Sequence, residues 1–194
     1  MMRVWFLHAC LLALAPLLSG SSVADPIIGE DAEFCSEDLK VEYPDIGDVS
    51  CCHIPARYHK ALVSDWGLPR ITYANAKKDQ LYVVMIVDPD APRRNNPKSS
   101  CWRHFLATNV WGEDLLTGKI IKTILSEYSR PSPPEGTGDH RYQILVYEQL
   151  SGTHPQLSPE AQKSLGKWDP KAFAADNGLV GPVATTQFIA QNPK

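Results

Sequence analysis

Two carboxylates follow a strongly apolar run of the sequence within three positions. The run is "LYVVMIV". The stretch "DPDAP", which contains Asp88 and Asp90, follows it directly. The run has no polar residue to mark a side facing water, so it predicts a strand buried on both faces. Proline cannot pair in a strand and stiffens a turn. The two carboxylates therefore either cap a solvated turn or belong to a site at the end of a buried strand.

A histidine stands in a second predicted strand, "CWRHFLATNVWG", which follows a loop rich in Pro, Asn and Ser. Strand alternation predicts two faces. One carries Trp102, His104 and Leu106, and the other carries Arg103 and Phe105. A lone histidine on a strand is more often a hydrogen-bonded core residue than a ligand contact. His104 is therefore a candidate site residue only together with the other polar groups.

A third predicted strand, "RYQILVYEQL", begins beside another loop rich in Pro and Gly. Alternation places His140 and Tyr142 on one face and Arg141 on the other. The glycines of "GTG" would let backbone N–H groups approach a phosphate. The alternative is that His140 and Tyr142 form a pair on the surface.

If the three strand ends converge, their polar groups form a small pocket at the rim of an apolar sheet. Carboxylates accept hydrogen bonds or meet a cation, imidazoles donate singly or doubly, and a phenol donates through its hydroxyl. A carboxylate beside an imidazole favours the charged form and raises its pKa. Such a set suits a zwitterion, for example a phosphate ester that carries an ammonium. Two histidines and a carboxylate could instead bind a transition metal.

The first 24 residues predict a secretory signal peptide rather than part of the fold. Arg3 precedes an apolar stretch from Val4 to about Leu18, and small residues follow with Ser22 and Ala24 as an A-x-A-like cleavage site. We expect cleavage before Asp25, which leaves residues 25–194 as a single domain. An uncleaved anchor is the alternative, although the apolar stretch is short for a membrane span. The sequence thus predicts a secreted protein, extracellular or lysosomal, with no transmembrane segment in the mature chain.

Secretion changes the reading of the cysteines, because an oxidising compartment favours disulfides. The candidates are Cys35, Cys51, Cys52 and Cys101. A bridge between the two adjacent cysteines needs a strained ring, so we expect Cys35 to pair with one of them and Cys101 with the other. Free buried thiols are the alternative, and a zinc site is disfavoured because there is no paired C-x-x-C.

The composition predicts an ordinary mainly β domain. The chain has 194 residues, of which 43% are hydrophobic and 21% are charged. Strands joined by irregular loops predict a mainly antiparallel sheet. Two short helices are predicted from their capping residues. Ser158 before Pro159 and Asp169 before Pro170 are N-cap signals, and Gly178 is a stop signal for the second helix.

Several function classes find no support in the sequence. The net charge of −3 provides no basic field for nucleic acid. There is no G-x-S-x-G elbow, no P-loop and no G-x-G-x-x-G. With the cysteines assigned to disulfides, a Cys–His nucleophile is disfavoured. We expect no catalytic residue, no cofactor and no resident metal.

Two motifs taken together resemble the phosphatidylethanolamine-binding protein family, which includes a cytosolic kinase-inhibiting member and the plant florigens. They are "DPDAP" followed by "WRHF", and "GTGDHRY" leading into a strand, in the family's order and approximate spacing. The resemblance is strong over residues 81–149 and weaker through "WDPKAFAADNGLVGPVATTQF". The signal peptide and "FCSEDLKVEYPDIGDVSC" resemble the secreted branch of that family.

The resemblance implies a large antiparallel sheet packed on a smaller sheet, with short peripheral helices. It also implies a pocket for a phosphate or phosphoethanolamine head group. The matching pocket residues are Asp88, Asp90, His104, His140 and Tyr142, and the loop "SPPEGTG" brings Ser132, Pro133 and Pro134 near the ligand.

This chain departs from the family's pattern at two places. Cytosolic members often have two adjacent histidines, where this sequence has Arg103 before His104. They also carry a C-terminal helix that closes the pocket, whereas this chain stops at "QFIAQNPK". We expect that closing helix to be absent and the pocket to be more open.

The sequence predicts a secreted, non-enzymatic binder of a phospholipid head group or another small phosphate-bearing ligand that could modulate signalling. One alternative is an inhibitor of a protease or of a kinase cascade that acts through its surface on a protein partner. A metal-dependent hydrolase that uses Asp88, His104 and His140 is a further alternative.

Overall fold

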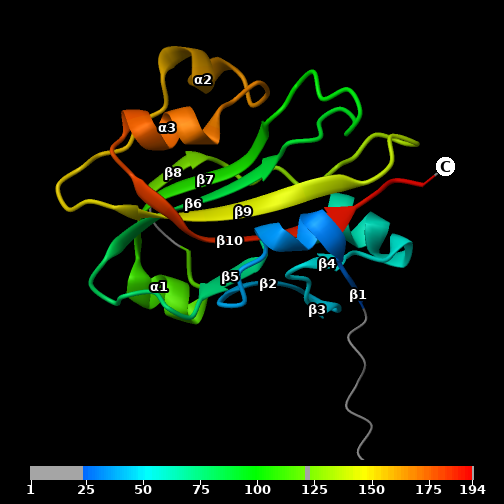
Figure 1. Cartoon of the computed structure of the whole chain (residues 1–194), viewed down its shortest axis with the longest axis horizontal. Helices are drawn as coiled ribbons and strands as arrows, with labels where there is room; N and C mark the ends of the chain where they lie inside the picture. Colours follow the sequence, from blue (N-terminus) through cyan, green and yellow to red (C-terminus); the bar gives the residue numbers. More distant parts are fainter. Residues whose placement is uncertain (1–23, 121–122, 194) are drawn as a thin grey trace, which may run out of the picture.

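A large β-sheet forms the centre of the molecule in the computed structural model, which describes residues 24–120 and 123–193. A smaller sheet covers one face of the large sheet, and the helices α2 and α3 cover the other face (Figure 1). The predicted signal peptide lies outside the described residues apart from Ala24. Within the described part of the chain, no helix has the length and apolar character to cross a bilayer.

The seven strands of the large sheet come from all parts of the described chain. In sheet order they are β1 (Asp25–Pro26), β4 (Cys52–His53), β10 (Val180–Ala190), β9 (His140–Gln149), β6 (Leu81–Asp88), β7 (Trp102–Trp111) and β8 (Thr123–Ser126). The smaller sheet has the order β3 (Gly47–Asp48), β2 (Leu39–Tyr43) and β5 (Arg70–Tyr73). The helical elements are η1 (Gly29–Phe34), η2 (Ala56–Tyr58), η3 (Ala61–Asp65), α1 (Gly112–Thr117), α2 (Pro159–Lys163) and α3 (Pro170–Asp176).

The expected fold class is confirmed, with one refinement of the sheet type. Every pairing among the described strands is antiparallel except β4 with β10, so the large sheet is mixed. The apolar run at residues 81–87 lies in β6, between β7 and β9. Its residues from Tyr82 onward are buried on both faces, as the sequence predicts.

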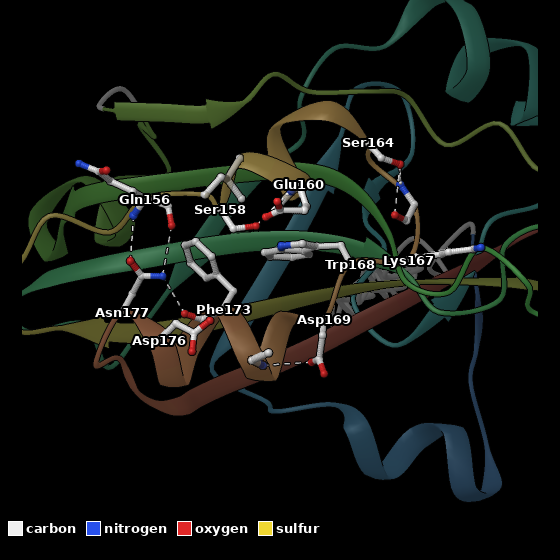
Figure 2. Close-up of a pocket in the computed structure, with 14 residues that line it drawn as sticks. Gln156, Ser158, Glu160, Ser164, Lys167, Trp168, Asp169, Phe173, Asp176 and Asn177 are labelled. Atoms are coloured by element: carbon white, nitrogen blue, oxygen red, sulfur yellow. Dashed lines mark hydrogen bonds between the residues drawn. The ribbon is translucent and has the colours of Figure 1, made fainter.

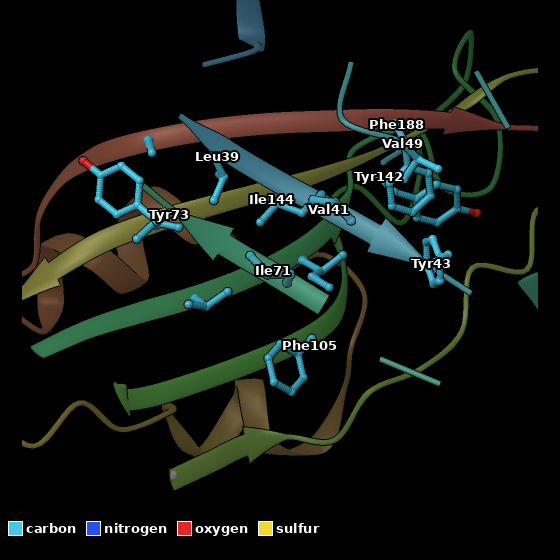
Figure 3. Close-up of a cluster of buried hydrophobic side chains, with 14 of the residues drawn as sticks. Leu39, Val41, Tyr43, Val49, Ile71, Tyr73, Phe105, Tyr142, Ile144 and Phe188 are labelled. Carbon is cyan, nitrogen blue, oxygen red and sulfur yellow. The ribbon is translucent and has the colours of Figure 1, made fainter. Parts of the chain in front are cut away.

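Two apolar cores explain why β6 has no polar side. Between the sheets, Leu39, Val41 and Ile71 of the smaller sheet meet Ile144 and other residues of the large sheet (Figure 3). On the opposite face, alternate residues of the large sheet pack under α2 and α3. Fully burying one such aliphatic or aromatic side chain contributes roughly 1.5–3 kcal/mol. The central strands are therefore held from both sides, and their ends are fixed in space.

A β-bulge in β7 changes the two faces that simple alternation predicts. Ile86 and Val87 of β6 are neighbours, but their partners are Phe105 and Arg103, which leaves His104 as the extra residue. Phe105 consequently packs in the core between the sheets, and Leu106 packs under the helices. The prediction that His104 and Leu106 lie on the same face of the strand is wrong, because the extra residue at the bulge inverts the alternation after it.

The two helices on the outer face begin where the sequence predicts. The Asp169 side chain accepts hydrogen bonds from the N–H groups of Lys171 and Ala172 at the start of α3. The Ser158 hydroxyl accepts one from the N–H of Ala161 at the start of α2. These caps satisfy N–H groups that have no partner inside the helix.

The predicted disulfide of Cys35 is confirmed, and the predicted disulfide of Cys101 is wrong. A disulfide joins Cys35 and Cys51, as one of the expected pairings requires. Cys52 and Cys101 are free thiols. Cys52 lies in β4 and Cys101 directly precedes β7, four strand spacings away, which is about 19 Å at about 4.8 Å per spacing. A disulfide needs Cα atoms within about 7 Å, so these two cannot bridge. They also pack in different cores, on opposite faces of the sheet.

We expect peptide mapping of the unreduced, denatured mature chain to show Cys35 linked to Cys51, with alkylation of Cys52 and Cys101. Burial is the first cause that raises the pKa of both free thiols, so alkylation of the native protein should be slow at each. A peptide that contains Cys101 in a disulfide would contradict this arrangement.

Candidate ligand-binding site

A cavity of about 280 Å³ lies where the end of β6 meets the starts of β7 and β9. The residues that line it are Asp88, Ala91, Pro92, Ser99, Trp102, His104, Ser129, Arg130, Ser132, Pro134, His140 and Tyr142. The three strand ends that the sequence singles out therefore do converge. Of the residues predicted for the site or placed near the ligand, all line this cavity except Asp90 and Pro133.

Asp88 is the last residue of β6 and is 4% exposed. One carboxylate oxygen accepts a hydrogen bond of 2.7 Å from the backbone N–H of Asp90. The other lies 2.8 Å from Nδ1 of His140, at the start of β9. Each oxygen has one hydrogen-bond partner within the protein, so Asp88 orients the turn and the His140 ring.

His140 is 1% exposed and is bonded at both ring nitrogens. The Thr137 hydroxyl donates to the carbonyl of Pro134 at 2.7 Å, and its oxygen lies 2.9 Å from Nε2 of His140. With that hydroxyl proton committed to Pro134, Nε2–H donates to Thr137 while Nδ1–H donates to Asp88. This network gives each ring nitrogen a hydrogen-bond partner and holds the His140 ring against Asp88.

The structure does not place Asp90, which the sequence predicts as a ligand-binding residue, among the residues that line the cavity. Its side chain is 2% exposed, and its carboxylate accepts from Nε and Nη2 of Arg141 at 2.9 and 2.7 Å. It also accepts from the backbone N–H of Arg141 at 2.9 Å. Arg141 points away from the face of His140 and Tyr142, as alternation predicts. Asp90 thus fixes the "DPDAP" turn from behind.

A chain of ion pairs extends from this turn to the N-terminal part of the domain. Asp31, in η1, binds Arg94 through two hydrogen bonds of 2.7 and 2.8 Å and lies 3.4 Å from Nη1 of Arg141. The hydrogen bond from Arg94 is the first cause that lowers the pKa of the Asp31 carboxyl. The segment before the disulfide is therefore tied to the back of the cavity.

His104 presents a buried nitrogen without a partner. It is 5% exposed, and Nδ1 lies 2.7 Å from the carbonyl oxygen of Ser129, so Nδ1 carries the proton and donates. Nε2 is buried and has no hydrogen-bond partner among the described residues. Leaving such a group unpaired costs roughly 1–3 kcal/mol, which a ligand in the cavity would recover.

Burial is the first cause of a lowered pKa at His104, and it outweighs the raising effects of the Ser129 carbonyl and the Asp88 charge. The Asp88 charge does raise the pKa of His104, as expected, but the expected net rise is not found, because burial disfavours the charged imidazole more strongly. His104 is neutral in the empty cavity near neutral pH.

Tyr142 forms the floor of the cavity beside His104. Its ring stacks on Phe188 with centroids 5.2 Å apart and meets the ring of His104 edge to face, also at 5.2 Å. Burial is the first cause that raises the pKa of its hydroxyl well above the ordinary value near 10, and the Asp88 charge adds to it. The hydroxyl therefore stays protonated and can donate to a ligand.

Sequence reasoning missed Arg130, although it lines the same cavity. Its Nε donates to the backbone carbonyl of Trp66 at 2.7 Å. Arg130 lies in an irregular loop rich in proline and serine, where no periodic pattern indicates which side chains turn inward. The one available signal is its position two residues before Ser132, which the family resemblance places near the ligand.

A second cavity, of about 640 Å³, lies between α2 and α3 on the other side of the large sheet (Figure 2). Trp168 and Phe173 form its apolar part, and its polar groups largely bond one another, as Asn177 does with Gln156. None of the predicted site residues lines it. This cavity is larger, but no residue that lines it has a buried polar atom without a partner comparable to Nε2 of His104. We therefore take the smaller cavity as the candidate site.

Comparison with known proteins agrees with this geometry. Residues 52–188 match the family model described as phosphatidylethanolamine-binding protein, a span that contains every residue that lines the smaller cavity. The chain belongs to the phosphatidylethanolamine-binding protein family. The resemblance that the two motifs indicate is therefore confirmed at the level of the family.

Solved structures similar to this chain come from several members of the family. A carboxypeptidase Y inhibitor, solved in complex with its cognate proteinase, is 25% identical with a TM-score of 0.60, over 79% of this chain and 82% of that chain. The phosphatidylethanolamine-binding protein of Plasmodium vivax is 17% identical with a TM-score of 0.56, over 79% and 84%. That of Plasmodium falciparum is 15% identical with a TM-score of 0.56, over 91% and 92%. The Plasmodium structures support the fold alone.

Replacing Arg141 with Met should lower the free energy of unfolding by about 3 kcal/mol, because the carboxylate of Asp90 would remain buried without its partner. The matched control is Arg94→Met, which removes an arginine of the same network that is 45% exposed, and it should cost about 0–1 kcal/mol. Urea unfolding monitored by fluorescence measures both. Equal losses in the two variants would show that Asp90 is not held as described.

Nitrogen-15 NMR of the histidine rings should find His104 in the Nδ1–H form near neutral pH, with a pKa below the ordinary value near 6.5. The Nε2 resonance should carry the shift of an unprotonated nitrogen. A His104 imidazolium that persists above about pH 7 would contradict the lowered pKa.

Proposed function

We propose that the chain is a secreted, non-enzymatic protein that binds a small phosphate-bearing ligand, such as a phosphoethanolamine head group, in the cavity lined by His104 and Tyr142. The observation that carries this proposal is that His104 lines the cavity while its buried Nε2 has no hydrogen-bond partner among the described residues. The Tyr142 hydroxyl beside it is a second group that can donate.

The volume and the charges of the cavity support a small polar ligand. A cavity of about 280 Å³ is at the lower end of the range for small-molecule sites. Asp88 and His140 are hydrogen-bonded within the protein rather than left for a ligand. A proton taken up by Nε2 of His104 would let that nitrogen donate to a phosphate oxygen.

The same geometry gives little support to a metal-dependent hydrolase. Asp88 and His140 are engaged with each other and with Asp90 and Thr137, and using them as ligands would break that network. Across residues 24–120 and 123–193, no three His, Cys, Asp or Glu side chains are grouped to hold a metal ion. The proposed role is therefore binding, without turnover of the ligand.

The proposed location rests on the signal-like start of the sequence and on the disulfide between Cys35 and Cys51. Disulfides persist in the secretory pathway and outside the cell. We propose that the chain belongs with the secreted branch of the family, phosphatidylethanolamine-binding protein 4, which its N-terminal segment resembles.

Protease inhibition is the second candidate function, and one comparison favours it. The carboxypeptidase Y inhibitor that shares this fold at 25% identity was solved in complex with its proteinase. An inhibitor of that kind would act through its surface, independently of the cavity. Inhibition of a carboxypeptidase that persists in a His104→Phe variant would support this second function.

Calorimetry with glycerophosphoethanolamine, a phosphodiester, tests the proposed function directly. His104→Phe keeps an aromatic ring against Tyr142 but removes Nε2, and it should weaken binding about tenfold or more, because charge-assisted hydrogen bonds contribute roughly 1.5–3 kcal/mol. Glu160→Gln, in the other cavity, is the matched control and should bind as the wild type does. Equal affinity in wild type and His104→Phe would overturn the assignment of this cavity.

The affinity for this diester should rise as the pH falls from about 7 to about 5. Burial lowers the pKa of His104 in the empty protein, so the imidazole must take up a proton before it donates to phosphate. A phosphodiester has no second ionisation in this range, which leaves the histidine as the titrating partner. Calorimetry at several pH values, in buffers of different ionisation enthalpy, measures both affinity and proton uptake. Binding without proton uptake near neutral pH would contradict this mechanism.

A further inference from the structure

Arg130 is a cation at the cavity whose charge no carboxylate of the described residues balances. Its only hydrogen bond within the described part of the chain joins Nε to the carbonyl of Trp66. Other arginines close to the site differ, since Arg94 and Arg141 both bind carboxylates. The two terminal nitrogens of Arg130 therefore remain available to a partner from outside the protein.

The loop that carries Arg130 is held in place at three successive residues. The hydroxyl of Tyr128 bonds that of Tyr43 at 2.8 Å. The backbone N–H of Ser129 donates to the carbonyl of His104 at 2.8 Å, and the Ser129 carbonyl accepts from Nδ1 of the same histidine. The bond from Arg130 to Trp66 then fixes the guanidinium plane. An exposed arginine held in this way loses less conformational entropy when it binds a ligand.

Arg130 is the arginine among the residues that line the cavity, and its positive charge is fixed. The titratable groups that line it are Asp88, His104, Arg130, His140 and Tyr142. Asp88 and His140 bond each other, His104 is neutral near neutral pH, and Tyr142 stays protonated. The Arg130 guanidinium does not titrate in the physiological range and bonds no carboxylate of the described residues. It therefore offers an anion a fixed positive charge even where His104 is neutral.

We propose that Arg130 is a specificity-determining residue of this cavity, and that its terminal nitrogens hold the phosphate of the ligand while Nε2 of His104 contacts it from within. This inference rests on the proposed function, and it assigns to the binding site a fixed positive charge from Arg130. A planar guanidinium matches two oxygens of a phosphate, which selects an anionic phosphate ester over a neutral alcohol or amine of similar size. The source of the phosphate is either a free phosphate ester or the head group of a lipid.

The test compares Arg130→Gln and Arg130→Lys with Arg93→Gln, an exposed arginine outside the lining residues whose loss changes the net charge equally. Binding of glycerophosphoethanolamine and of inorganic phosphate is measured by calorimetry at low and at physiological salt. Arg130→Gln should weaken both by about tenfold and reduce the dependence of affinity on salt. Arg130→Lys should recover part of the loss, and Arg93→Gln should stay within about twofold of wild type.

A flotation assay with phosphatidylethanolamine vesicles distinguishes the two sources of phosphate. Wild-type binding to vesicles indicates a lipid head group, and binding to the soluble esters alone indicates a free ligand; Arg130→Gln should weaken whichever occurs. Wild-type affinity in Arg130→Gln together with a loss in His104→Phe would overturn the role of Arg130 and leave the proposed function standing. Failure of the wild type to bind any of these probes would overturn both.

Discussion

The hydrogen bond between Asp88 and His140 is the interaction on which the rest of the site depends. It joins the last residue of β6 to the first residue of β9, and both partners are almost fully buried. A buried carboxylate is costly unless it is paired and hydrogen-bonded, and here each oxygen has a donor. The pair therefore holds two strand ends and the turn after β6 in one arrangement. The cavity takes its shape from that arrangement.

The surrounding structure supports this pair and leaves Nε2 of His104 without a hydrogen-bond partner among the described residues. The ion pairs of Asp90, Arg141 and Asp31 hold the turn from behind, on the side away from the cavity. The two apolar cores hold the strands themselves. A bulge lies at His104, whose ring meets that of Tyr142 and whose buried Nε2 has no bond within the described residues. Bulges beside binding sites commonly redirect a side chain in this way.

The sequence predicts much of this architecture, and its failures have physical reasons. The strands at β6, β7 and β9 are long and apolar, so their pattern is strong, and the two capped helices have local signals. The smaller sheet has strands of two to five residues, which are too short to show a period, and only the family resemblance implied it. The partner of Asp90 is 51 residues away along the chain, and no local pattern connects them. The bulge at His104 adds one residue without a sequence signal, and Arg130 lies in a loop without periodicity.

The central claim is that the cavity of His104, Tyr142 and Arg130 holds a phosphate, and a crystal structure of the protein with phosphoethanolamine tests it most directly. The account predicts phosphate density in the cavity, within hydrogen-bond distance of Nε2 of His104 and of the terminal nitrogens of Arg130. It also predicts that the contact between Asp88 and His140 is the same with and without ligand. Density between α2 and α3 instead, or an empty cavity at saturating ligand, would contradict the account.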